Sequence, residues 1–383
     1  MPAPLEGVLV LDLSRVLAGP FCTMLLGDLG ARVIKVEHPR DGDVTRGWGP
    51  PVHEESGLSA YFLSINRNKE SIALDLASPS GRESVGILAR KADVCVENFP
   101  PGGLARFGLD LARLRQDNPR LVTASITGSG SVGPEAKLPG FDLLAQAAAG
   151  LMAVTGEPGG EPVKVGVAAS DLFAGCFAAV GILGALVGRA RSGRGGHVAV
   201  DLFSSTAAAL INVAQSALLT GREAVRHGNT HPQIVPYRLF AASDGEFVLA
   251  AGTDPQFARL ADVLGRESWR DDPAYRTNAA RVVHRERLEG EIAAILLRET
   301  RQTWIARLRA AGIPAGPVRG PLEALESETA QALGLVQSLR GVRFVASPLR
   351  VEGYTPPLAF PPALDEHGPA LRKEFGLPEN RPS

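Results

Sequence analysis

The chain is dominated by one long apolar segment near its middle. From Leu172 to Val187 every residue is uncharged and most are apolar and small. Such a run predicts a helix that is buried on all sides. Asp171 is the last polar residue before it, which makes it the expected N-cap, where a carboxylate accepts hydrogen bonds from unpaired helix N–H groups.

Asp171 has two interpretations that local sequence leaves open. It is either a helix cap alone, or a nucleophile. A carboxylate at the positive end of a helix dipole stays ionised, and carboxylates form covalent acyl intermediates. A membrane span is a weaker interpretation of the segment, because the run falls short of ~20 residues and its flanks follow no topology pattern.

Shorter apolar runs before this segment alternate with stretches of helical periodicity. A strand, a helix and a strand within about thirty residues form a βαβ unit, so we predict a parallel sheet and an α/β class. The predicted strands span residues 8–13, 31–37, 71–76, 94–99, 121–126 and 196–202, and the predicted helices between them span residues 19–30, 81–91 and 142–153.

The pattern changes after the last of these strands. A mostly helical passage over 204–220 leads to a loop, and residues 237–240 and 246–251 flank a Ser-Asp-Gly turn as a β-hairpin. Charged amphipathic helices follow, and a second hairpin-like piece starts at Val342. We therefore expect a large domain over 1–204, a linker over 205–228, a small α/β domain over 229–320 and a C-terminal segment over 321–383.

Composition narrows the function classes. The chain has 383 residues, is 45% hydrophobic and 21% charged, and carries a net charge of −1, which argues against nucleic acid or an anionic membrane as the main partner. The cysteines, Cys22, Cys95 and Cys176, lie far apart and predict buried thiols in a reducing compartment. No signal-peptide pattern opens the chain, so we expect a cytoplasmic protein. The histidine pair His227 and His231 lies in a loop without cysteines, so we expect no metal site.

Two features imitate a dinucleotide site without its context. Glu37 ends the second predicted strand, where a ribose-binding carboxylate would stand, but the first turn, residues 14–20, lacks the glycine fingerprint. Residues 128–133 read G-x-G-x-x-G after a strand, yet Pro134 follows directly and no helix opens there to receive a pyrophosphate. A nicotinamide enzyme is therefore disfavoured.

Several sequence blocks in combination resemble the class III coenzyme A transferases. These blocks are residues 33–37, 42–48, 66–76, 93–102, 139–142 with 146–147, 193–196, 269–275 and 312–318. The family includes formyl-CoA transferase, carnitine CoA-transferase, dicarboxylate CoA-transferases that use succinyl-CoA, and α-methylacyl-CoA racemase. The resemblance covers nearly the whole chain. It implies a Rossmann-like large domain, a smaller α/β domain, a C-terminal segment that returns to the large domain, and a homodimer of two interlinked rings.

The resemblance also implies roles for individual residues. In the transferases an aspartate just before the buried helix is the nucleophile, and Asp171 falls on it. The implied chemistry passes through an aspartyl–acyl anhydride and an aspartyl-CoA thioester, with oxyanions that nearby backbone N–H groups would stabilise. Coenzyme A would be bound as a thioester substrate, with no tightly held cofactor. By position, the CoA contacts of the family fall on Leu17, Ala18, His38, Leu74, Asp75, Asn98, Phe99, Arg106 and Phe141. Arg106 would suit a phosphate and His38 the adenine.

Departures from the family pattern favour a transferase. The racemases carry a histidine before the aspartate of the Gly-x-Asp block, because they need a second acid/base, and this chain has Phe141 there. They also use a glutamate where this chain has Asp254. Leu17 replaces a glutamine of formyl-CoA transferase, and residues 231–237 look more like the dicarboxylate transferases. We expect a CoA-transferase acting on an acyl-CoA, with succinyl-CoA as donor, and a carboxylic acid. The alternatives are a 2-methylacyl-CoA racemase, or a CoA-binding protein in which Asp171 only caps a helix.

Overall fold

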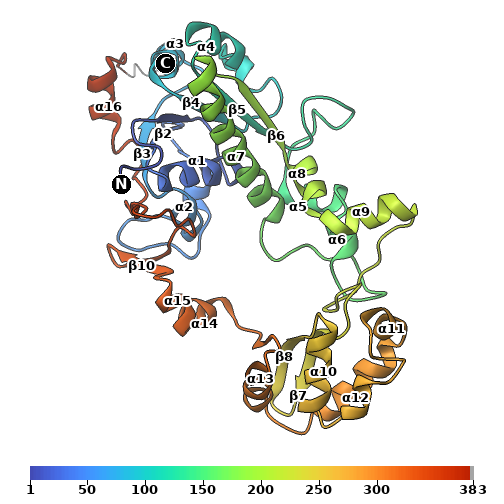
Figure 1. The fold of residues 1–383 in the computed structure, drawn as a ribbon. Helices are drawn as coiled ribbons and strands as arrows, with labels where there is room; N and C mark the ends of the chain where they lie inside the picture. Colours follow the sequence, from blue (N-terminus) through green and yellow to red (C-terminus); the bar gives the residue numbers. More distant parts are fainter. Residues whose placement is uncertain (380–383) are drawn as a thin grey trace. The chain divides into compact units, whose positions relative to one another are not determined.

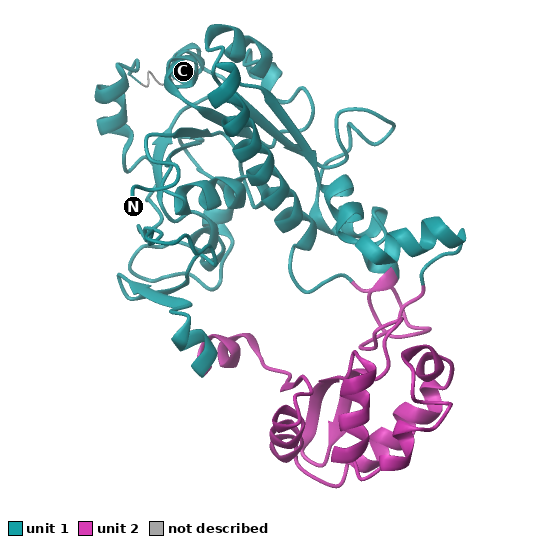
Figure 2. Cartoon of the chain, viewed as in Figure 1, with its two compact units in different colours: residues 1–153, 164–224, 328–383 teal, residues 154–163, 225–327 magenta. Residues whose placement is uncertain are grey.

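The computed structural model describes residues 1–379, which belong to two compact units (Figures 1 and 2). Unit 1 contains residues 1–153, 164–224 and the chain from Glu328 onward, and unit 2 contains residues 154–163 and 225–327. Most of the stretch that we expected as a linker, residues 205–228, is helical and lies in unit 1. Residues 154–163, which follow the fifth strand in the chain, lie in unit 2.

Unit 1 is built on a six-stranded sheet in which all neighbouring strands are parallel. The strands are β1 (Leu9–Asp12), β2 (Arg32–Glu37), β3 (Lys69–Ala73), β4 (Val94–Glu97), β5 (Val122–Thr127) and β6 (His197–Asp201). Their order is β3-β2-β1-β4-β5-β6, which confirms the predicted parallel α/β class. The order reverses between β1 and β4, and open α/β sheets bind ligands outside the carboxyl ends of the strands at such a point.

Helices cover both faces of this sheet (Figure 1). On one face lie α1 (Ala18–Asp28) and α7 (Ala169–Ser192), and on the other lie α3 (Pro79–Lys91) and α4 (Leu111–Asp117). The central strands are apolar at consecutive positions because both of their faces are covered. Val10 accordingly packs with the α1/α7 layer, while its neighbour Leu11 packs with the α3/α4 layer.

Shorter elements complete unit 1. They are η1 (Val44–Gly47), α2 (Ala60–Ile65), η2 (Leu104–Phe107), α5 (Asp142–Ala148), α6 (Leu151–Val154), α8 (Leu202–Ala209), α9 (Ile211–Thr220), α15 (Glu328–Ala332), β10 (Val336–Leu339), β11 (Val342–Val345) and α16 (Gly368–Phe375). The helix expected over 142–153 is interrupted at Gly150, whose φ of 89° is left-handed. β3 begins two residues before its predicted start, at Lys69, because Lys69 and Glu70 pair with β2.

Unit 2 contains the predicted hairpin. β7 (Tyr237–Ala242) and β8 (Gly245–Ala250) are antiparallel, and β9 (Ala315–Pro317) pairs with β8. The helices of this part are α10 (Asp254–Val263), η3 (Glu267–Arg270), α11 (Asn278–Val283), α12 (Arg285–Leu296), α13 (Arg301–Ala310) and α14 (Pro321–Leu325). Apolar residues of the sheet and of α10, α12 and α13 form its separate core.

The expectation that the apolar segment is buried on all sides is wrong. α7 buries Ala178 and Ile182, but Phe177, Val180 and Val187 are between 46% and 67% exposed. Cys176 lies on the same outer side and is exposed, whereas the other two cysteines are buried as expected. Over the described residues, α7 and the bent pair of α8 and α9 have the length and composition of membrane spans. α7 nevertheless packs along α1, β5, β6 and α8, so one side of it is a core helix.

Candidate active site

Asp171 lies inside the first turn of α7 and is not its N-cap. The helix begins at Ala169 and its N-cap is Ala168, which makes no side-chain hydrogen bond. The capping oxygen comes instead from Asp142, the first residue of α5. Its Oδ1 accepts hydrogen bonds from the backbone N–H of Ser170 at 2.8 Å and from that of Asp171 at 3.4 Å. The predicted cap is therefore wrong, because a carboxylate from another helix satisfies these donors.

Gln146, one turn after Asp142 in α5, fixes this arrangement. It is fully buried, and its Nε2 donates to Asp142 Oδ2 at 2.7 Å and to the Val167 carbonyl at 3.2 Å. Its Oε1 accepts from the backbone N–H of Val165 at 2.8 Å. One amide thus joins α5 to the segment that leads into α7, and the position of Asp171 follows from it.

The Asp171 carboxyl has an unusual protonation equilibrium. Burial, and secondly the negative charge of Asp142, raise its pKa from 3.8 to about 7. Within residues 1–379, no group donates a hydrogen bond to its carboxylate oxygens. Its lone pairs are consequently free for another reaction partner, and its charged form predominates only above about neutral pH.

The first turn of α7 has no N–H group left for an oxyanion. The N–H of Ala169 donates to the Val167 carbonyl at 2.8 Å, and that of Leu172 donates to the Ala168 carbonyl at 3.1 Å. The N–H groups of the two residues between them are bonded to Asp142. The oxyanion donors that we expected near Asp171 therefore have to come from another segment.

Tyr61 on α2 supplies one candidate donor that the sequence analysis missed. Burial and the charges of Asp171, Asp142 and Asp43 raise its pKa to about 12, so the phenol keeps its proton. The Trp48 ring packs edge-on against it, with the ring centroids 5.0 Å apart. No sequence motif marks this tyrosine, because the charge of Asp171 reaches it only in the folded chain.

A pocket lies at the carboxyl ends of β1, β2, β3 and β4, beside the point where the strand order reverses. Among the residues predicted to bind CoA, His38, Leu74, Asp75 and Phe99 line it. Arg15, directly after β1, also lines it, and its guanidinium lies over the Phe99 ring, 4.7 Å from the centroid. The sequence analysis missed Arg15, although its place after the first strand of a doubly wound sheet is a usable signal.

The remaining predicted contacts are not among the residues that line this pocket. Leu17 and Ala18 begin α1 with buried side chains, so only their backbone is available to a ligand. Asn98 uses both ends of its amide on the backbone of Arg15, at 2.8 and 2.6 Å. Arg106 is exposed on η2, and Phe141 is 65% exposed just before Asp142.

Close packing of α1 on α7 links the pocket to Asp171. Gly175 lies one turn after Asp171, and a Cβ at this position would be 2.7 Å from the Ala18 carbonyl oxygen. Only glycine permits this approach. The start of α1 therefore packs directly on the part of α7 that follows the nucleophile candidate. Across residues 1–379, no group of three or more His, Cys, Asp or Glu side chains is arranged to hold a metal ion.

Comparisons with known proteins identify relatives along the whole length. The family model described as CoA-transferase family III matches residues 5–368. A succinate–glutarate CoA-transferase of Agrobacterium fabrum is 41% identical over 371 residues, which is 93% of this chain and 93% of the relative. An acetyl-CoA:oxalate CoA-transferase of Acetobacter aceti is 40% identical over 379 residues, 98% of this chain and 97% of the relative. The crystal structure of a CaiB/BaiF family protein from Brucella suis superposes with a TM-score of 0.88 at 40% identity, covering 98% of this chain and all of that one.

Proposed function

We propose, from the premise that this chain belongs to CoA-transferase family III, that it moves coenzyme A from succinyl-CoA to a dicarboxylic acid acceptor. The family membership makes the chain a CoA-transferase. The choice of succinyl-CoA is supported by the succinate–glutarate relative, together with succinyl-CoA:glutarate and succinyl-CoA:D-citramalate transferases at 44% and 36% identity. The acetyl-CoA:oxalate relative is about as similar, so acetyl-CoA and oxalate are the alternative donor and acceptor to test.

The observation that carries the proposal is the Asp171 carboxylate, which is partly buried, accepts no hydrogen bond among residues 1–379 and follows directly on the turn that Asp142 caps. In the proposed first step, an Asp171 oxygen attacks the thioester carbonyl, and the C–S bond breaks to give an aspartyl–acyl anhydride and CoA thiolate. The thiolate then attacks the aspartyl carbonyl, which forms an aspartyl-CoA thioester and releases the donor acid. The acceptor carboxylate attacks this thioester, and its C–S bond breaks to give a second anhydride and CoA thiolate. The thiolate then attacks the acceptor's acyl carbon, which forms the new acyl-CoA and releases the Asp171 carboxylate.

Each of these steps passes through a tetrahedral oxyanion. Because the N–H groups at the start of α7 are already bonded, we assign the Tyr61 phenol as one donor to these oxyanions. With a pKa of about 12 it stays a neutral O–H group from the pH at which Asp171 ionises, about 7, up to about pH 12.

The pocket at the strand ends and the start of α1 together provide our proposed path for a CoA thioester. We place the adenine at His38 and Phe99, and the phosphates at the guanidinium of Arg15 with Arg106 nearby. The pantetheine arm would then run along the backbone of Leu17 and Ala18 toward Asp171. In this arrangement CoA is a substrate that leaves each cycle, and no tightly bound cofactor is needed.

The racemase alternative requires a second acid/base beside the aspartate of the Gly-x-Asp block. Phe141 occupies that place, and a hydrocarbon ring cannot exchange a proton. Its exposure of 65% leaves the ring free for contact with substrate or with a partner chain, and it has no role in proton transfer. We therefore favour CoA transfer over racemisation.

We further propose that the chain acts as a cytoplasmic homodimer, interlinked as the family resemblance implies. The exposed Phe177, Val180 and Val187 on α7, with Leu218 and Leu219 on α9, form apolar surface that a monomer would leave in water. Association with a second copy would bury it. Light scattering coupled to size-exclusion chromatography tests this proposal, and a monomer at micromolar concentration would contradict it.

The test of the reaction is covalent trapping. The protein is incubated with succinyl-CoA or acetyl-CoA and hydroxylamine, and the peptide that carries Asp171 is examined by mass spectrometry, with Asp171→Ala as the control. A hydroxamate at Asp171 in the wild type alone supports the mechanism, and glutarate and oxalate then identify the acceptor. If no donor modifies Asp171 and the protein catalyses deuterium uptake at the α-carbon of a 2-methylacyl-CoA, CoA transfer is contradicted and racemisation is supported.

A further inference from the structure

The loop between β1 and α1 is held almost entirely by side chains from elsewhere in unit 1. The Ser14 N–H and hydroxyl both donate to Asp12, the first at 2.9 Å. The Arg15 N–H and carbonyl are bonded to the Asn98 amide. None of these backbone groups takes part in the sheet or in the helix, so the conformation of the loop depends on the side chains around it.

Val16 has a backbone conformation that is unfavourable for valine. Its φ is 70°, in the left-handed region, where a β-branched side chain is a genuine outlier. Such a conformation costs free energy and persists only when surrounding contacts determine it. The contact here is with Asp43, whose Oδ2 and Oδ1 accept from the Val16 N–H at 3.2 and 3.4 Å.

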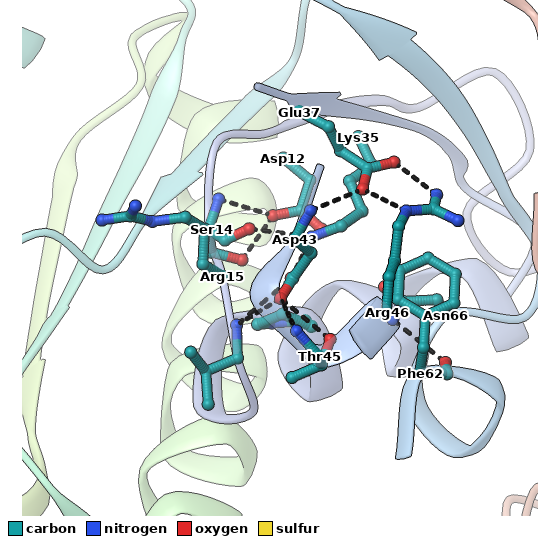
Figure 3. Close-up of polar contacts among 12 residues, drawn as sticks. Asp12, Ser14, Arg15, Lys35, Glu37, Asp43, Thr45, Arg46, Phe62 and Asn66 are labelled. Atoms are coloured by element: carbon teal, nitrogen blue, oxygen red, sulfur yellow. Dashed lines mark hydrogen bonds and ion pairs between the residues drawn. The ribbon is translucent and has the colours of Figure 1, made fainter. Parts of the chain in front are cut away.

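Asp43 is itself one half of a fully buried ion pair. Lys35 Nζ, at 0% side-chain exposure, donates to Asp43 Oδ2 at 2.9 Å and to the Ser14 carbonyl at 2.9 Å (Figure 3). Asp43 is also the N-cap of η1, and its Oδ1 accepts from the N–H and the hydroxyl of Thr45. The pair therefore contacts the loop at both Ser14 and Val16.

Both members of the pair are charged. Burial alone would lower the pKa of Lys35, but the carboxylates of Asp43 and Asp12 raise it above its ordinary value. Burial alone would raise the pKa of Asp43, but the Lys35 ammonium and the Thr45 hydrogen bonds lower it. Both side chains also line the pocket at the strand ends.

We propose that the Lys35–Asp43 pair is a positioning device for coenzyme A: it holds Val16 in its left-handed conformation, so that Arg15 extends over Phe99 into the pocket. Figure 3 shows the Arg15 side chain extending away from the ion pairs while its backbone stays among them. This inference rests on the proposed CoA site. It assigns to Lys35 and Asp43 the task of positioning Arg15, which would contact the coenzyme.

A role in stability alone explains the pair less well. Buried ion pairs are weak sources of stability, because desolvation offsets their attraction, and replacement by apolar residues is often neutral or stabilising. Unit 1 holds a matched pair for comparison: Arg67 donates to both oxygens of Asp28 at 2.9 and 2.6 Å and is also buried. That pair makes no contact with the loop or the pocket.

The test separates positioning from stability with charge-free variants. In Lys35→Met/Asp43→Leu both charges leave together, so the fold keeps no unpaired buried charge. We expect the Kd of free CoA and the KM of the acyl-CoA to rise about tenfold, because only part of the loop population is then competent to bind. The kcat and the KM of the acceptor acid should change less than about twofold, since Asp171 lies outside the loop. Should this variant fail to fold, Asp43→Asn is the second variant: it removes the carboxylate, keeps the size of the side chain and an oxygen that can accept a hydrogen bond, and should raise the Kd of CoA in the same direction.

Rescue provides the second readout. Val16→Gly, introduced into the Lys35→Met/Asp43→Leu background, should recover most of the CoA affinity, because glycine adopts the left-handed conformation without strain. Asp28→Asn is the control, and it should lower the melting temperature with no change in the Kd of CoA. A wild-type Kd in Lys35→Met/Asp43→Leu, no rescue by Val16→Gly, or an equal loss of affinity in Asp28→Asn would each overturn the inference. If free CoA does not bind the wild-type protein at all, the proposed CoA site fails and the inference with it.

Discussion

Replacing Asp171 by asparagine should make the protein inactive and, at alkaline pH, more stable. Asn keeps the size and the backbone contacts of the residue but cannot form an anhydride, so transfer should fall at least about 10⁴-fold. The change in stability follows from the pKa, which is about 7 in the folded chain against an ordinary value of 3.8. The folded state therefore holds this proton more tightly than the unfolded chain does.

The sign and size of the stability effect follow by linkage. Well below pH 3.8 the carboxyl is neutral in both states and costs the fold nothing. As pH rises toward 7 the unfolded chain releases its proton first, and stability falls. Above pH 7 the cost is complete and amounts to at most about 4 kcal/mol. The Asp171→Asn variant does not carry this cost, so its advantage over the wild type should grow from acid to alkaline pH.

Urea unfolding of the wild type and of Asp171→Asn at pH 5 and pH 8.5 measures this difference. Asp117→Asn serves as control, since Asp117 is an exposed residue at the end of α4 in the same unit. The control should shift the unfolding free energy equally at both pH values. An Asp171→Asn variant that gains nothing between pH 5 and pH 8.5, or that is less stable than the wild type at pH 8.5, would refute the argument that the nucleophile is held at an energetic cost.

Other substitutions test the surroundings of the same site. Asp142→Asn removes the negative charge beside Asp171, so the acid limb of the kcat/KM profile should move to lower pH; an unmoved limb would assign the raised pKa to burial alone. Tyr61→Phe should lower kcat about tenfold or more at an unchanged KM for the acceptor, measured at saturating acyl-CoA, and a kcat equal to that of the wild type would remove the phenol from the oxyanion site. Arg15→Gln should raise the KM of the acyl-CoA several-fold and weaken its dependence on ionic strength, whereas an unchanged salt dependence would place the phosphates elsewhere.

The sheet could be predicted from sequence because of how it is buried. β1, β2 and β4 are covered on both faces, so their sequences are unbroken apolar runs bounded by turn residues, and such runs identify parallel strands. The hairpin of β7 and β8 could also be predicted from sequence, since a Ser-Asp-Gly turn between two apolar stretches is typical of a β-hairpin. Both predictions rest on patterns within a short stretch of sequence, and such patterns can be recognised in a single sequence.

The errors at α7 came from contacts that no local pattern contains. Asp171 precedes the apolar run and has a favourable capping side chain, but the cap is Asp142, positioned by Gln146 on a separate helix. The burial of α7 was overestimated because composition measures how apolar a segment is and not how many of its sides meet the same chain. Similarly, nothing in the sequence reveals that Val16 is left-handed, since a valine gives no hint of positive φ.

The capping of α7 by Asp142 instead of Asp171 has a chemical consequence. The oxygens of a carboxylate that caps its own helix accept hydrogen bonds from backbone N–H groups. These hydrogen bonds stabilise the negative charge and make the carboxylate a weaker nucleophile. Here Asp142 occupies the donors of Ser170 and Asp171, so the Asp171 oxygens remain unbonded. The same neighbour adds a second negative charge, which together with burial raises the pKa and with it the basicity of the attacking oxygen. Asp142 thus replaces Asp171 as the cap and makes the Asp171 carboxylate more basic. Because the pKa is about 7, a substantial fraction of Asp171 is still ionised near neutral pH.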